Sequence, residues 1–298
     1  MNGPTPLVSV RGLRVGIRGR HGDHELVHDV GFDIAPGRVL GLVGESGSGK
    51  SLTALSLMRL HAAPVEILGG EVVVDGRDIV ALTQRELNAY RGATSAMVYQ
   101  NPMSALNPVM RVGDQVAEAI RRHSPLSRAA ARVRVGELFD EVGIARPVER
   151  YDAYPFELSG GMLQRVVIAM AISAGPRLLI ADEATTALDV TTQAKVLDLM
   201  SALARDRGMS MLFITHDLAV ASEFCDDIQV MYAGRTVERG SAAQVFRTPG
   251  HPYTRGLVAS LCTLDMPLDR PVPTLSDRAR SEATETAEFV HPLQGSVA

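Results

Sequence analysis

The segment at residues 44–51 constrains the fold of this chain more than any other stretch. It reads GESGSGKS, follows the apolar run VLGLV and precedes the helix-like SLTALSLMRL. This fits the pattern G-x-x-x-x-G-K-[ST], in which glycines let successive backbone N–H groups point inward at phosphate oxygens. A Gly/Ser-rich linker has a similar composition, but here the strand, the loop and the helix stand in the required order. The segment predicts a nucleotide-phosphate site formed by Gly44, Glu45, Ser46, Gly47, Ser48, Gly49, Lys50, Ser51 and Leu52.

Two adjacent acids end a second apolar run, LLIADE at residues 178–183. Side chains alternate across a strand, so Asp182 and Glu183 are expected to point in different directions. Asp182 can face Mg²⁺, which prefers oxygen ligands and which the Ser51 hydroxyl can also ligate. Glu183 can then face an attacking water as general base. Adjacent acids are commoner in solvated loops, but the four apolar residues before them favour the catalytic interpretation.

Three further polar features stand at the ends of strand-like or helix-like runs. Gln100 ends TSAMVYQ and His216 follows MLFIT, so each can reach a terminal phosphate from a neighbouring strand. Either residue alone would more often be an ordinary loop residue. The stretch LSGGMLQR at residues 158–165 opens an apolar helix, whose first N–H groups can hold a second anion.

The order of strand-like and helix-like runs predicts an α/β fold. Short β-branched runs fill residues 7–43, and GEVVVDGRDI adds another strand. From about residue 102 to 159 the periodicity becomes helical. Strand and helix then alternate to residue 226, which argues for a parallel sheet covered by helices. Residues 229–240 predict a hairpin, and the Pro/Ser/Thr-rich stretch from residue 267 predicts a poorly ordered tail.

The bulk composition excludes several classes of protein. The net charge of −4 gives no basic field for nucleic acid. Cys225 and Cys262 cannot build a disulfide framework, and we interpret them as inert thiols in a reducing compartment. The N-terminus does not resemble a signal peptide, and no run of about 18 apolar residues predicts a membrane span.

Taken together, these motifs resemble the ATP-binding subunits of ABC transporters, and the match is close to those of the oligopeptide/dipeptide importers. The resemblance covers about residues 7–262, with GESGSGKS, YQNP, LSGGM, LLIADE, TALD and THD in one collinear order. It implies a P-loop NTPase (RecA-like) core with an N-terminal antiparallel β subdomain and an inserted helical subdomain at about 102–165. Residues 1–240 would form the nucleotide-binding domain, 241–266 the importer-type C-terminal extension, carrying HPYT, and 267–298 the tail.

The resemblance also implies a role for each candidate site residue. ATP is held by the P-loop, Mg²⁺ by Ser51, Gln100 and Asp182, the lytic water by Glu183, and the γ-phosphate by His216. Ser159, Gly160 and Gly161 would cap the γ-phosphate of ATP bound to a second subunit, and Asp189 belongs to the D-loop between them. The second anion site thus indicates a dimer.

Three departures from the family pattern matter. Ile17 stands where an aromatic residue usually stacks on adenine, so the π-face is lost and base selectivity is in question. No cysteine follows Cys262, which excludes the four-cysteine iron–sulfur segment of some relatives. Met162 replaces the glutamine of many ABC proteins, as is common in this subtype.

The family implies its partners and its place in the cell. They are a second nucleotide-binding subunit, identical or related, two membrane permease subunits docked near residues 100–114, and indirectly an extracytoplasmic solute-binding protein. The chain would work as a peripheral protein on the cytoplasmic face of the membrane and bind no nucleic acid. Import of nickel or another small solute remains open, as does a soluble ABC ATPase acting on nucleic acid or ribosomes. A P-loop kinase or GTPase is disfavoured because LSGG, Gln100 and His216 occur in order.

Overall fold

The computed structural model describes residues 5–20, 22–186, 188–260 and 289–290. The chain divides into two compact units. One comprises residues 1–7, 35–37 and 75–212, which we call the helical unit, and the other residues 8–34, 38–74 and 213–298, which we call the P-loop unit. Strand β8 (Ser210–Thr215) crosses the boundary between them.

An antiparallel sheet in the P-loop unit confirms the expected N-terminal β subdomain. Its strands β1 (Val8–Ile17), β2 (His24–Ile34) and β4 (Val65–Val74) lie in the order β2-β1-β4. In β1 the side chains of Val8, Val10, Leu13 and Val15 are fully buried. Each pair follows the two-residue alternation of a strand, and the pairing register with β2 shifts between Val10 and Leu13.

The P-loop unit also contains the strand that leads into the phosphate loop. β3 (Val39–Val43) runs parallel to β9 (Asp227–Tyr232), and β9 forms the predicted hairpin with β10 (Arg235–Ser241). A two-residue strand, β11 (Phe289–Val290), lies within the tail that begins at residue 267 and pairs in parallel with β10. The rest of that tail lies outside the described residues.

The helices of this unit are α1 (Lys50–Met58), α9 (Leu218–Phe224), α10 (Ala242–Arg247) and α11 (Pro252–Ala259).

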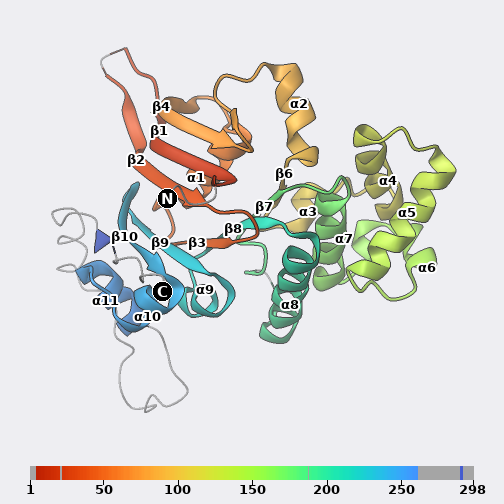
Figure 1. The fold of residues 1–298 in the computed structure, drawn as a ribbon. Coiled ribbons are helices and arrows are strands. Elements are labelled where there is room, and N and C mark those ends of the chain that lie inside the picture. The colour runs from red at the N-terminus through yellow and green to blue at the C-terminus, as the bar shows by residue number, and fades with distance from the viewer. Residues whose placement is uncertain (1–4, 21, 187, 261–288, 291–298) are drawn as a thin grey trace. The chain divides into compact units, whose positions relative to one another are not determined.

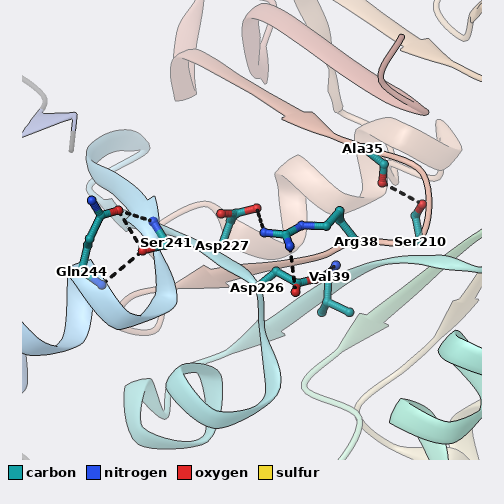
Figure 2. Close-up of polar contacts among 8 residues, drawn as sticks. All are labelled: Ala35, Arg38, Val39, Ser210, Asp226, Asp227, Ser241 and Gln244. Carbon is teal, nitrogen blue, oxygen red and sulfur yellow. Dashed lines mark hydrogen bonds and ion pairs between the residues drawn. The ribbon is translucent and has the colours of Figure 1, made fainter. Parts of the chain in front are cut away.

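One arginine fixes the starts of β3 and β9. Arg38 forms ion pairs with Asp226 at 3.2 Å and Asp227 at 3.1 Å, and the Val39 N–H donates to Asp226 at 2.7 Å (Figure 2). The Asp226 N–H donates in return to the Val39 carbonyl at 3.0 Å. These contacts set the register of two parallel strands at their amino ends, so that the carboxyl end of β3 delivers the phosphate loop.

The helical unit contains the inserted helical region and a parallel pair of strands. β6 (Ser95–Val98) pairs in parallel with β7 (Leu178–Asp182), in the order β8-β7-β6. The short strand β5 (Arg77–Asp78) and the 3₁₀ helix at Pro155–Glu157 also belong here. Its helices are α2 (Gln84–Ala93), α3 (Pro102–Ala105), α4 (Val112–His123), α5 (Arg128–Glu141), α6 (Pro147–Tyr151), α7 (Gly160–Ile172) and α8 (Val190–Arg207).

Helices α4 to α7 pack together, as expected for the helical region (Figure 1). Val112, Val116 and Ile120 form a buried stripe on α4 at helical spacing. Arg207 at the end of α8 donates two hydrogen bonds to the Glu141 carboxylate of α5, at 2.8 and 2.6 Å, and one to the Ile172 carbonyl at 2.9 Å. One guanidinium therefore joins the ends of α5, α7 and α8. No helix in the described part of the chain is both long and apolar enough to span a membrane.

Candidate nucleotide-binding site

The P-loop wraps around the side chain of Lys50, which is almost fully buried. Its Nζ donates to the carbonyls of Gly44 and Glu45, each at 2.8 Å, and to the Ser48 hydroxyl at 3.3 Å. The loop thus surrounds the ammonium group with these three neutral oxygen atoms. A lysine ammonium held in a phosphate loop can form charge-assisted hydrogen bonds with phosphate oxygens.

Two glycines are required by the path of the loop. Gly44 has a φ of 155°, and a Cβ built on it would lie 2.1 Å from the Met231 carbonyl oxygen. Gly49 has a φ of 98°, a region that side chains rarely adopt, and caps α1. Neither position tolerates a side chain, so the sequence pattern has a direct steric cause here.

Helix α1 begins in a way that suits an anion. Gly49 provides no side-chain cap, and the first turn carries no acidic residue that would offset the positive end of the helix. A Cβ on Gly47 would meet nothing within 4 Å, so the outer face of the loop is open there. The remaining loop positions divide into exposed Ser46 and Ser51 and half-buried Glu45 and Leu52. These observations fit a triphosphate on this loop.

His216 and Ile17 lie in the same unit as the P-loop. His216 is exposed in the turn between β8 and α9, where Asp217 caps α9 by accepting from the N–H groups of Ala219 and Val220 at 2.9 and 3.1 Å. Ile17 ends β1, half-buried, and pairs across the sheet with His24 and Val65. The roles of both residues remain predictions.

The helical unit brings two predicted site residues into contact. Gln100 lies two residues beyond β6, and Glu183 one residue beyond the parallel strand β7. Their side chains meet, with Gln100 Nε2 donating to Glu183 Oε2 at 2.9 Å. Asp182, the last residue of β7, is half-buried and directly precedes Glu183 in the sequence. The paired strands therefore place an amide and a carboxylate at one sheet edge.

Glu183 adopts a backbone conformation that is rare for its type. Its φ is 48°, in the left-handed region that costs about 1 kcal/mol or more for a non-glycine residue. Such strain persists only where surrounding contacts fix it, and the Gln100 hydrogen bond is one such contact. The strained residue, Glu183, is the one that the sequence predicts to face the attacking water.

The LSGG stretch opens α7 and packs on the start of α8. Ser159 caps α7, its hydroxyl accepting from the Met162 N–H at 3.4 Å. A Cβ on Gly161 would lie 2.6 Å from Thr192 Cγ2, so the glycine permits the close approach of α8, while Gly160 is exposed. Asp189 caps α8, and hydrogen bonds from Thr192 lower the pKa of its carboxyl group. Within the TALD stretch, Ala187 lies outside the described residues.

Sequence reasoning missed one residue that contacts the P-loop. The Tyr253 hydroxyl accepts from the Glu45 N–H at 3.4 Å, across 208 positions of sequence. The signal in the sequence was the HPYT motif, which the resemblance assigns to the C-terminal extension without a role at the P-loop.

Comparisons with known families and proteins agree with this geometry. Residues 27–186 match the family described as ABC transporter, and residues 237–288 that described as Oligopeptide/dipeptide transporter, C-terminal region. A putative peptide import ATP-binding protein of Brucella abortus is 48% identical over 270 residues, covering 91% of this chain and 81% of that protein. The oligopeptide transport ATP-binding protein OppD of Bacillus subtilis is 45% identical over 262 residues, covering 88% and 73%.

Solved structures show the same fold. The ATP-binding cassette MJ0796, a dimer bound to ADP and Pi, is 26% identical with a TM-score of 0.70, covering 79% of this chain and 98% of that one. A further dimeric MJ0796 structure, described as a bacterial ABC transporter cassette, has the same TM-score at 25% identity. The α/β P-loop NTPase fold expected from the sequence is thereby confirmed. The chain belongs to the ABC transporter family, as one of its ATP-binding, ATP-hydrolysing subunits.

Proposed function

We propose that this chain powers an importer of peptides or chemically related small solutes. The observation that carries the proposal is the joint presence of an intact P-loop and a C-terminal region of the oligopeptide/dipeptide type in one chain. Relatives named for peptide transport support the same substrate class, among them OppD and the probable D,D-dipeptide transport ATP-binding protein DdpD of Escherichia coli.

In this proposal the P-loop holds the phosphates of ATP. Lys50 matches the charge of the terminal phosphates, and the N–H groups at the start of α1 bind their oxygens. His216 contacts the γ-phosphate, and Glu183 takes the proton of the attacking water. Ile17 provides apolar contact to adenine without an aromatic face.

The residues available for Mg²⁺ suit a hard cation. Ser51, Asp182 and Gln100 offer a hydroxyl, a carboxylate and an amide oxygen, the ligand types that Mg²⁺ prefers. Because Gln100 Nε2 already donates to Glu183, the other polar atom of the Gln100 amide, Oε1, is the one that can ligate a cation. When bound, Mg²⁺ would neutralise charge on the β- and γ-phosphate oxygens.

The proposal includes a dimer of nucleotide-binding subunits. Ser159, Gly160 and Gly161 would cap the γ-phosphate held by the P-loop of the facing subunit, and Asp189 would lie at the interface. Removal of that phosphate would open the dimer and move permease subunits docked on residues 100–114. The chain would then act at the cytoplasmic face of the membrane, with a solute-binding protein on the other side.

Uptake measurements in cells that lack this chain test the substrate class. Complementation with the wild-type gene should restore uptake of a labelled tripeptide, and Lys50→Ala should not. Lys195→Ala is the matched control, because Lys195 is the only other lysine and is exposed on α8. Restored uptake of nickel without peptide uptake would contradict the peptide assignment and leave the ATPase role in place.

A further inference from the structure

We propose that Tyr253, in the C-terminal extension, is a positioning residue for Lys50 of the P-loop. The proposal rests on the assignment of the P-loop to ATP phosphates and extends it to a region outside the nucleotide-binding core. All of the contacts that carry it lie within the P-loop unit.

A buried carboxylate anchors the extension to the hairpin. Glu238 on β10 is 0% exposed and accepts hydrogen bonds from the N–H groups of Gly250 at 2.8 Å and His251 at 2.9 Å. A buried charge is costly unless such donors satisfy it, so these bonds fix the chain just before α11. His251 then caps α11, with Nδ1 accepting from the Tyr253 N–H at 3.1 Å. The start of α11 is therefore held in place.

The Tyr253 side chain is buried beside an aromatic ring at the end of β9. It is 0% exposed, and its ring lies 4.7 Å from that of Tyr232, centroid to centroid. Tyr232 ends β9 and follows Met231, whose carbonyl oxygen would lie 2.1 Å from a Cβ built on Gly44. The Tyr253 ring thus lies beside the end of β9, where the Met231 carbonyl approaches Gly44.

The Tyr253 hydroxyl contacts the same peptide unit that accepts a hydrogen bond from Lys50. That unit comprises the Gly44 carbonyl and the Glu45 N–H. Its carbonyl accepts from Lys50 Nζ at 2.8 Å, and its N–H donates to the Tyr253 hydroxyl at 3.4 Å. Since a peptide unit is planar, fixing its N–H also fixes the direction of its carbonyl. Tyr253 therefore sets the orientation of a Lys50 acceptor.

The first test is ATP affinity of the full chain carrying Tyr253→Phe, which keeps the ring and removes the hydroxyl. We expect the Kd for MgATP to rise about three- to five-fold, the effect of one hydrogen bond, with little change in kcat at saturation. Tyr151→Phe is the matched control, because Tyr151 is also buried and donates one hydrogen bond, to Asp114 at 2.9 Å in the helical unit. An unchanged Kd in Tyr253→Phe would overturn the proposal.

The second test asks whether the effect passes through Lys50. In a Lys50→Ala background, Tyr253→Phe should cause no further loss of affinity; an equal loss in both backgrounds would overturn the positioning role. Unchanged affinity in Lys50→Ala alone would instead contradict the proposed phosphate site. An NMR experiment without nucleotide tests the positioning role independently of the phosphate site. ¹³C-lysine labelling reports only Lys50 and Lys195, the two lysines of the sequence. Tyr253→Phe should shift the Lys50 signals and leave those of Lys195 in place; unmoved Lys50 signals would overturn the proposal.

Discussion

At the scale of single residues, Glu183 is the group on which hydrolysis is expected to depend. Glu183→Gln replaces the base with an amide of nearly the same shape, whose oxygen can still accept from Gln100 Nε2. We expect ATP to bind as in the wild type and phosphate release to fall at least about 100-fold. Equilibrium binding and single-turnover phosphate release measure the two effects separately.

The control for this change is Glu137→Gln. Glu137 is exposed on α5 and pairs with Arg134 at 2.6 Å, so it makes an ion pair without belonging to the proposed site. Its amide variant should hydrolyse ATP at the wild-type rate. Wild-type turnover in Glu183→Gln would refute the role assigned to that carboxylate.

Ile17 permits a second prediction at this scale. Ile17→Phe restores an aromatic face at the end of β1, and stacking on a base contributes about 0.5–1.5 kcal/mol. ATP should therefore bind about 2- to 10-fold more tightly. Tripolyphosphate, which has no base, should bind equally to both proteins. If Ile17→Phe binds tripolyphosphate more tightly, or binds ATP no more tightly than the wild type, then Ile17 does not contact the adenine base.

At the scale of elements, the junction of α7 and α8 depends on Gly161. An alanine Cβ there would lie 2.6 Å from Thr192 Cγ2, and the hydrogen bond of Thr192 to Asp189 holds that side chain. Gly161→Ala should lower the free energy of unfolding by about 1–3 kcal/mol, as overpacking does. Adding Thr192→Ser removes Cγ2 and should restore most of the loss, measured by denaturant unfolding.

Gly136 on α5 provides the matched control for this junction. A Cβ there would meet nothing within 4 Å, so alanine improves helix propensity without a clash. Gly136→Ala should raise the free energy of unfolding by about 0.5–1 kcal/mol. Destabilisation by both changes to a similar degree would mean that the α7–α8 contact does not explain the first.

The elements that the sequence predicts are those with strong local patterns. β3 with its loop and α1, the β9–β10 hairpin and the helices after residue 102 all carry such patterns and are confirmed. The short helices α10 and α11 escaped prediction, since six and eight residues show little periodicity. Their caps, Ser241 with Gln244 (Figure 2) and His251, are visible in the sequence only in retrospect.

Contacts between distant positions were predictable only where a rule of topology applied. Gln100 and Glu183 are 83 positions apart, yet both follow parallel strands, whose carboxyl ends share one edge. No comparable rule predicts the contact between Tyr253 and Glu45, because the position of the extension depends on hydrogen bonds to the buried carboxylate of Glu238. The positive φ of Glu183 was equally hidden, as non-glycine residues rarely adopt it.

At the scale of the whole molecule, the LSGG stretch predicts how the chain assembles. Ser159 and Gly160 are exposed at the start of α7, where a helix terminus can bind an anion. In the proposed dimer that anion is the γ-phosphate held by a second subunit. Glu183→Gln should therefore run as a dimer in MgATP and as a monomer without it, measured by light scattering after gel filtration.

Ser159→Arg in the Glu183→Gln background separates binding from assembly. The arginine removes the cap and fills the anion site, so the monomer should bind ATP normally but not dimerise. Ser127→Arg is the control, because Ser127 is likewise an exposed cap, on α5, accepting from the Ala130 N–H at 3.2 Å. Both variants lose about 0.5–2 kcal/mol of helix capping, so only the dimer should distinguish them. A Ser159→Arg protein that dimerises in ATP would show that the second anion site serves some purpose other than a neighbour's nucleotide, whereas one that fails to bind ATP as a monomer would place Ser159 in the chain's own site.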